Sequence, residues 1–504
     1  MLWMWWAIDA RTGEISYTVD DAYIHGTIAK NLALHGTFGI NPGEFAGASS
    51  SLLWTFLLAT AFLATGIHAW LPALLATLFG VLAIERSNLL LKRIGIGPWL
   101  RLVMVLMAMA YAPVLPIVST GMEHTFHAWS VMGLFALLVR EAAGKSANPW
   151  VILIWGTLAA GGRYESLFLL PPLLIRLALR KKWIHVAALT AGMFLPVVAF
   201  AACSLAHGGY ALPNSLMLKG NVSGAFHIRI FDVLLGNNHL MVLATLLLIA
   251  TLALFLTGRK PSVSWAWLPA SALGTLLIHL QLASLGWFWR YEGYLVMLGM
   301  IALAPALVPL QVWLRRLPRP LESAIWILLI ADTYPLFQRF RRSAGEIVQA
   351  AGNIRDQQLQ MARVIRHLGP GARVAANDLG AVSFFSEARV LDLWGLGDNV
   401  IARAKREGRE TAEYLRERME EKKTDFVVCY PSWFKPSVDL PESLIAVQMW
   451  QLGGNLVCAS DTVAFYATSP EAAARLAAAL RAYQAEVGTG PARSTNLMGP
   501  LMWK

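Results

Sequence analysis

The sequence predicts an α-helical polytopic membrane protein that carries a soluble α/β domain at its C-terminal end. Of its 504 residues, 56% are hydrophobic and only 14% are charged, whereas soluble domains carry roughly 25% charged residues. The charges are unevenly distributed, because 34 of the first 336 residues are charged and 39 of the last 168. This composition excludes an ordinary cytosolic protein and an intrinsically disordered chain, and it indicates that the two parts of the chain lie in different solvents.

Residues 1–336 contain ten apolar stretches, and they predict about ten to eleven transmembrane helices. A helix needs about 20 apolar residues to cross a bilayer core. The stretches are 70–91, 100–118, 126–140, 149–162, 166–180, 183–205, 238–257, 263–285, 292–312 and 320–336. The run at 52–64 predicts an interfacial or re-entrant helix. The opening residues 1–8 indicate either an interfacial anchor or the remnant of a first helix.

Clusters of basic residues predict the orientation of these helices. They fall at every second connection, as the positive-inside rule requires of cytoplasmic loops. The clusters are Lys92/Arg93, Arg140/Lys145, Arg176/Arg180/Lys181/Lys182, Arg259/Lys260 and Arg315/Arg316/Arg319. The net charge of +11 is therefore interpreted as a sign of topology and not of nucleic-acid binding. The other connections, at 119–125, 163–165, 206–237 and 286–291, are expected to face outward together with the segment at about 9–50 and the C-terminal domain.

Residues 337–487 predict the soluble α/β domain. Short buried strands are expected at 373–376, 390–393 and 425–430, and helices at 410–423 and 470–487. The tail at 488–504 is predicted to be disordered. Cys429 and Cys458 both lie in this domain, and whether they pair is left open.

Asp20 and Asp21 are the first candidates for chemistry on the outer face. Adjacent carboxylates repel, which raises the pKa of one of them unless a cation or metal is near. A carboxylate at this place can accept a proton from a sugar hydroxyl. The alternative is that Asp20 caps the helix that follows it.

The remaining candidates are polar residues that interrupt apolar outward-facing segments. Ionisable groups at membrane depth are costly and usually face a cavity or each other. Arg163 with Glu165, and Arg290 with Glu292, are therefore either functional groups or structural ion pairs. Glu123 is typical of a helix start, and His124 beside it is a possible metal ligand. Lys219, which follows Asn214, either binds an anionic headgroup or reaches past the apolar surface to water.

Several sequence blocks resemble those of a known family. The block from Asp20-Asp21-Ala22-Tyr23-Ile24 through Asn41-Pro42-Gly43-Glu44 is similar to the first external loop of bacterial GT-C glycosyltransferases, in particular the mycobacterial terminal arabinofuranosyltransferase group. Further blocks follow in the family's order. They are Thr120-Gly121-Met122-Glu123, Arg163-Tyr164-Glu165, Leu212-Pro213-Asn214-Ser215 with Lys219, Arg290-Tyr291, 377–381 and 392–396.

This resemblance implies an enzyme of the bacterial cytoplasmic membrane, with its C-terminal domain outside the cytoplasm. Such an enzyme transfers a hexosyl or pentosyl group from a polyprenyl-phosphate-linked donor to a glycan, lipid or protein acceptor, with inversion at the anomeric carbon. The resemblance assigns the catalytic base to Asp21 or Asp20.

From the same residues we expect the donor phosphate to be held by Lys219, Arg163 and Arg290. Glu123, His124, Glu165 and Asn214 are expected to bind substrate. A divalent metal is a further possible requirement, with Asp20, Asp21 and His124 as its candidate ligands. The competing interpretations are a transporter or flippase for the same lipid-linked sugar and a catalytically inactive scaffold of the same fold.

Overall fold

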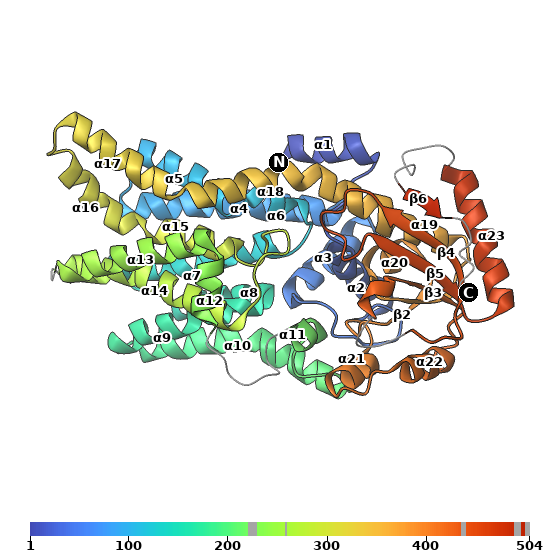
Figure 1. The fold of residues 1–504 in the computed structure, drawn as a ribbon. Helices are drawn as coiled ribbons and strands as arrows, with labels where there is room; N and C mark the ends of the chain where they lie inside the picture. The colour runs from blue at the N-terminus through green and yellow to red at the C-terminus, as the bar shows by residue number, and fades with distance from the viewer. Residues whose placement is uncertain (220–228, 258–259, 435–439, 488–494, 499–504) are drawn as a thin grey trace.

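The computed structural model of the chain describes residues 1–219, 229–257, 260–434, 440–487 and 495–498. They form a long bundle of helices with a sheet domain at one end (Figure 1). The predicted fold class, a helical membrane part followed by a small α/β domain, is confirmed.

The bundle consists of an N-terminal helix, two helices that belong to the first loop and its exit, and a series of mostly apolar helices. Their bounds are α1 (Leu2–Thr12), α2 (Asp21–His35), α3 (Leu52–Thr65), α4 (Leu71–Ile94), α5 (Pro98–Tyr111), α6 (Val114–Ser119), α7 (His124–Ala142), α8 (Pro149–Gly162), the 3-10 helix η1 (Tyr164–Leu169), α9 (Leu170–Leu179), α10 (Trp183–Ala206), α11 (Asn214–Lys219), α12 (Ile230–Gly236), α13 (Asn238–Leu256), α14 (Lys260–Leu282), α15 (Gly293–Ala302), α16 (Ala304–Leu314) and α17 (Arg319–Asp332).

Few of the described helices are both long and apolar enough to cross a bilayer alone. By length and composition α4, α10 and α13 pass this test, and α15 with α16 forms a pair, bent by 41°, that raises the number to four. The apolar helices α3, α5 and α8 have 14 residues each, fewer than the about 20 that a full crossing needs. The predicted ten to eleven crossings would require shorter helices to act in series, and that number stays a prediction.

Proline explains why several expected spans are broken. The expected span at 100–118 is divided into α5 and α6 at Pro113, and the span at 292–312 is divided just before Pro305. The expected span at 320–336 ends early, because a new helix begins at Tyr334 and carries Pro335 in its first turn. Proline lacks the N–H that continues a helix and disfavours helical geometry in the residue before it.

The helix α18 (Tyr334–Ile354) joins the bundle to the sheet domain, as Figure 1 shows, and continues into the π-helical turn η2 (Arg355–Leu359) and α19 (Gln360–Arg366). Arg339 of α18 is buried and donates to the Tyr111 carbonyl at 2.7 Å and to Glu292 at 2.7 Å. A buried guanidinium requires such partners. This pair therefore ties α18 to the turn before α15.

The C-terminal domain contains a six-stranded sheet in the order β2-β1-β3-β5-β4-β6. β1 pairs in parallel with β2 and β3, while β5 pairs with β3 and β4, and β6 with β4, in antiparallel fashion. The bounds of the strands and remaining helices are β1 (Arg373–Ala376), α20 (Gly380–Phe385), β2 (Arg389–Asp392), α21 (Asn399–Arg406), α22 (Ala412–Glu421), β3 (Phe426–Cys429), the 3-10 turn η3 (Pro431–Trp433), β4 (Ile445–Leu452), β5 (Thr462–Ala467), α23 (Pro470–Val487) and β6 (Thr495–Met498).

The three expected strands match β1, β2 and β3 to within one residue at most ends, and the two expected helices match α22 and α23. The sequence patterns did not indicate β4 and β5. Within the expected tail, residues 495–498 form β6, and the other tail residues lie outside the described part of the chain. Cys429 and Cys458 are both buried and free, so they do not form a disulfide.

The first loop contacts the sheet domain through α2 and α20. At the start of α20 the backbone lies against Asp20, and a Cβ added at Gly380 would lie 2.3 Å from the Asp20 carbonyl oxygen. Gly26 of α2 faces the ring of Phe384, which would lie 3.0 Å from an added Cβ. Both contacts leave no room for a larger residue.

We expect Gly380→Ala to destabilise the packed junction by about 1–3 kcal/mol, because the added methyl group must displace backbone atoms. Gly345→Ala is the matched control, since it also adds a methyl group to a helix but would meet no atom within 4 Å. The control should be neutral or stabilising by up to about 1 kcal/mol. Thermal unfolding of the detergent-solubilised protein measures both, and equal midpoints would contradict the prediction.

Candidate active site

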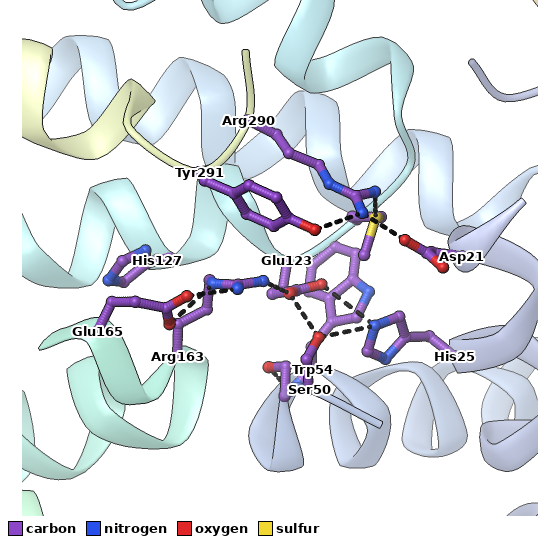
Figure 2. Close-up of polar contacts among 12 residues, drawn as sticks. Asp21, His25, Ser50, Trp54, Glu123, His127, Arg163, Glu165, Arg290 and Tyr291 are labelled. Carbon is purple, nitrogen blue, oxygen red and sulfur yellow. Dashed lines mark hydrogen bonds and ion pairs between the residues drawn. The ribbon is translucent and has the colours of Figure 1, made fainter. Parts of the chain in front are cut away.

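Charged side chains from four parts of the chain meet where the first loop joins the helix bundle. Figure 2 shows this group, called here the junction cluster, which comprises Asp21, His25, Ser50, Glu123, Arg163, Glu165, Arg290 and Tyr291. Asp21 and His25 belong to α2, and Ser50 lies just before α3. The others come from the turns before α7, after α8 and before α15. The cluster therefore depends on the tertiary fold and not on any single segment.

Arg163 is held between two carboxylates. Its Nη1 lies 2.5 Å from Glu123 Oε1, and its Nη2 lies 2.6 Å from Glu165 Oε1. The backbone of Arg163 is extended at the end of α8, with φ −158° and ψ 142°, so that the side chain leaves the helix axis. The Glu123 side chain is 0% exposed and that of Arg163 is 7% exposed. Side chains that are buried to this extent remain charged at an acceptable cost only when an opposite charge lies beside them.

Arg290 forms the second cationic point of the cluster. Its guanidinium pairs with Asp21 and donates to the Tyr291 hydroxyl at 3.1 Å. Its Nη1 also lies 2.8 Å from Met122 Sδ, while its Nε is buried without a hydrogen-bond partner among the described residues. The Tyr291 ring lies beside both guanidinium groups, at 5.0 Å from that of Arg290 and 5.5 Å from that of Arg163. A cation over an aromatic face is favourable.

The turn that presents Arg290 has an uncommon backbone. Trp287, Phe288 and Trp289 have φ values of 44°, 61° and 56°, in the left-handed region that large side chains avoid. Such positions cost of order 1–3 kcal/mol each and persist only where neighbouring structure holds them. Here Glu292 accepts from the Gly286 N–H at 2.9 Å, and Arg339 donates to the Trp289 carbonyl at 3.0 Å. Hydrogen bonds therefore hold both ends of the turn in place.

His25 and Ser50 complete the cluster, and the sequence did not single out either as a site residue. Ser50 Oγ donates to Glu123 Oε1 at 3.1 Å, and His25 Nε2 lies 3.4 Å from Glu123 Oε2. Burial lowers the pKa of His25, which favours its neutral imidazole. His25 stands one helical turn after Asp21, a spacing that places both on one face. This spacing is the feature of the sequence that could have identified His25 as a site residue. For Ser50 the sequence offers only its position near the start of a helix.

Asp20 and Asp21 have different surroundings, although they are adjacent. Asp20 accepts from the backbone N–H groups of Gly380 at 2.6 Å and Ala381 at 2.8 Å. Burial and the neighbouring carboxylate of Asp378 raise the pKa of Asp20. The structure thus shows Asp20 in contact with α20 of the sheet domain, whereas Asp21, whose side chain is 25% exposed, faces Arg290.

The other predicted site residues differ in how close they lie to this cluster. His124 is buried beside Tyr291, with ring centroids 6.1 Å apart, and its Nε2 has no hydrogen-bond partner among the described residues. Asn214 lies elsewhere, because its side-chain amide donates to the Leu396 carbonyl at 3.0 Å and to Asn399 at 2.9 Å. It ties α11 to the connection between β2 and α21. Lys219 ends α11, and its side chain lies outside the described part of the chain.

The divalent metal stays a prediction, and the structure shows how its candidate ligands are engaged. Within the described ranges no group of three or more His, Cys, Asp or Glu side chains could hold a metal ion. Of the three candidate ligands, Asp20 accepts from backbone N–H groups and Asp21 pairs with Arg290. At Asp21 an arginine already supplies the positive charge that a metal ion would bring to the carboxylate. Two of the three expected ligands are therefore engaged by other groups.

Comparison with known proteins identifies the fold. A domain family of unknown function, DUF8728, matches residues 352–466, and no curated protein matches the chain. The structure is similar to that of ArnT from Cupriavidus metallidurans bound to undecaprenyl phosphate, with a TM-score of 0.54 and 12% identity over 94% of this chain and 97% of that chain. The apo state of the same protein gives a TM-score of 0.51 and 12% identity over 92% and 96%. The chain therefore has the GT-C fold, as the sequence resemblance implied.

Removing Arg163 tests whether the junction cluster depends on paired charges. We expect Arg163→Met to destabilise the protein by about 3–5 kcal/mol, because it leaves two buried carboxylates without a cation. Adding Glu123→Gln and Glu165→Gln should restore much of this loss. The pair of the exposed Arg342 with Glu346 supplies the control, for which Arg342→Met should cost less than about 1 kcal/mol. Similar losses for both arginines, measured by denaturant unfolding in detergent, would contradict the prediction.

Proposed function

We propose that this chain is a membrane glycosyltransferase that uses a polyprenyl-phosphate-linked sugar and transfers the sugar to an acceptor at the outer face of the bacterial cytoplasmic membrane. The observation that carries the proposal is the pairing of the partly exposed carboxylate of Asp21 with the buried guanidinium of Arg290. A base and an anion-binding group are thereby side by side in a chain with the GT-C fold. The lipid phosphate of the solved ArnT structure supports this class of donor.

Charge balance suggests how the donor would enter. The junction cluster holds two guanidinium groups and the three carboxylates of Asp21, Glu123 and Glu165. Glu123 is fully buried and Glu165 is 12% exposed, while Asp21 is the most exposed of the three. A donor phosphate would therefore take the place of Asp21 on Arg290. This exchange keeps both cations neutralised and releases the Asp21 carboxylate for the acceptor.

In the proposed reaction the released Asp21 accepts the proton of an acceptor hydroxyl. The acceptor oxygen forms a bond to the anomeric carbon from the face opposite the phosphate, and the bond between that carbon and the phosphate oxygen breaks with its electron pair. The configuration of the anomeric carbon is thereby inverted. Arg290 and Arg163 stabilise the leaving polyprenyl phosphate, as fixed cations do for developing negative charge.

Asp21 is preferred to Asp20 as the base because of what each carboxylate already contacts. The Asp20 oxygens both accept backbone N–H groups of α20 and the side chain is buried. A general base must be reached by the acceptor hydroxyl whose proton it takes. Of the two carboxylates, only that of Asp21 is partly exposed. In this proposal the sheet domain covers the outer face and helps to bind the acceptor, which is a glycan, a lipid or a protein.

Replacing the proposed base should abolish turnover without unfolding the protein. We expect Asp21→Asn to lower sugar transfer by about 10²–10⁴-fold, the range typical of lost general-base catalysis. The assay follows transfer from a polyprenyl-phosphate sugar in proteoliposomes, and Asp9→Asn on the exposed face of α1 is the isosteric control. Full activity of Asp21→Asn would refute the base assignment. Movement of the donor across the bilayer without transfer would instead favour a flippase.

Arg290→Lys tests the proposed phosphate contact, because lysine keeps the charge but loses the planar fork that binds two oxygens. We expect kcat/KM for the donor to fall by roughly 10²-fold. Arg342→Lys, at an exposed arginine of α18, should leave the kinetics unchanged. If the two variants have the same kcat/KM, Arg290 does not contact the donor.

A further inference from the structure

His25 is a buried residue of the junction cluster to which the proposed reaction assigns no role. Its side chain is 3% exposed, and it lies one helical turn after Asp21 on α2. Its two ring nitrogens have different neighbours. Nδ1 lies 3.1 Å from Ser49 Oγ, whereas Nε2 lies 3.4 Å from Ser50 Oγ and 3.4 Å from Glu123 Oε2. Figure 2 shows the ring directed toward Glu123. The two sides of the ring therefore contact two different polar groups.

The groups around the ring determine which nitrogen carries the proton. A neutral imidazole has one N–H, and its other nitrogen accepts. Ser50 has a single hydroxyl proton, which it donates to Glu123 Oε1, so toward Ser50 the Nε2 of His25 can only donate. Glu123 Oε2 is buried without a hydrogen-bond partner among the described residues, and a buried acceptor of this kind requires a donor. Both neighbours therefore favour the proton on Nε2.

Ser49 supplies the matching donor on the other side of the ring. In the Nε2–H form Nδ1 accepts, and the Ser49 hydroxyl lies within reach of it. Another acceptor near that hydroxyl is the Ser51 carbonyl at 2.9 Å, but this carbonyl also accepts from Thr55 Oγ1 at 2.9 Å. The Ser49 proton is therefore free to bond Nδ1, and this bond selects the tautomer of His25.

Glu123 links His25 to an arginine of the proposed reaction. Of the five N–H groups of a guanidinium, Arg163 directs two to Glu165 and one to Glu123, which leaves two for a ligand among the contacts of the described residues. Glu165 lies two residues after Arg163, whereas Glu123 joins Arg163 to the first loop through Ser50 and His25. The orientation of the Glu123 carboxylate therefore affects which N–H groups of Arg163 face a ligand.

We propose that His25 is a positioning residue of the transferase, which donates its Nε2–H to Glu123 Oε2 and so holds Arg163 in the orientation that meets the donor phosphate. The inference rests on the proposed function. The separation of 3.4 Å is longer than that of an ordinary N–H···O bond, and hydrogen bonds of catalytic sites often shorten once substrate is bound. His25 acts through Glu123 and does not itself touch the reacting atoms.

Two amide substitutions separate this role from a purely structural one. The side-chain nitrogen of glutamine can take the place of Nε2, whereas that of asparagine can take the place only of Nδ1. We expect His25→Asn to lower kcat for transfer from a polyprenyl-phosphate sugar in proteoliposomes by roughly 10²-fold, the cost of a misplaced catalytic group, with a smaller change in KM. His25→Gln should keep most of the activity. His35→Asn and His35→Gln, at the exposed end of α2, are the matched controls and should leave both constants unchanged.

The tautomer of His25 is a second readout, and it does not depend on sugar transfer. Nitrogen NMR of the full-length protein in lipid bilayers, with isotope-labelled histidines, distinguishes a protonated Nε2 from a protonated Nδ1. The signal of His25 is the one that is lost in His25→Gln. We expect the Nε2–H form in the unaltered protein. In Ser49→Ala, which lacks the donor to Nδ1, we expect a mixture with the Nδ1–H form.

Equal losses of kcat in His25→Asn and His25→Gln would overturn the proposal, and so would the Nδ1–H form in the unaltered protein. An unaltered protein that transfers no sugar would refute the proposed function and with it the positioning role, while the tautomer would still report the contact with Glu123. If His25→Asn fails to fold, the activity of His25→Gln and the tautomer decide.

Discussion

The organisation of this protein depends on the cost of enclosing charge where a helix bundle meets a soluble domain. A buried guanidinium or carboxylate is tolerated only when an opposite charge and hydrogen bonds surround it. Arg163 satisfies this requirement with Glu123 and Glu165, and Arg339 does so with Glu292 and two backbone carbonyls. These two arginines are far apart in the chain. Glu165 is two residues from Arg163, whereas Glu123 and Glu292 lie in other segments than the arginines they pair with, so these ion pairs join parts of the chain that are distant in sequence.

The Arg339–Glu292 pair connects this requirement to the candidate active site. Glu292 and Arg339 hold the turn in which three consecutive aromatic residues have positive φ, and Arg290 follows directly. Without those contacts the turn would relax toward an ordinary backbone, and the guanidinium of Arg290 would move away from Asp21. The helix α18, which links the bundle to the sheet domain, thus also orients the guanidinium of Arg290. The strained backbone of this turn persists because the buried ion pair of Arg339 with Glu292 holds it in place.

Part of this arrangement could be predicted from the sequence, and the reasons for success differ between elements. The strands β1 to β3 and the helix α23 were predicted because their patterns are local. Arg163 and Arg290 stood out because each interrupts an apolar segment. Asp21 stood out because it follows another carboxylate, and Glu123 because of its place at a helix start. What could not be predicted is how they pair, because the pairs involve the start of α2 and three turns that are distant in sequence. Local patterns likewise could not show that Asn214 binds the sheet domain rather than the cluster, or that prolines break several expected spans.

The different roles of Asp20 and Asp21 follow from the helical geometry of α2. Asp20 precedes the helix and accepts two N–H groups of α20, while Asp21 begins the helix and points toward Arg290. Because these residues are adjacent, the contact of Asp20 with the sheet domain fixes the chain one peptide unit before Asp21. His25, one turn later, contacts Glu123. The position of the proposed base is therefore coupled to the docking of the sheet domain, which gives a physical reason for two adjacent carboxylates that bind different partners.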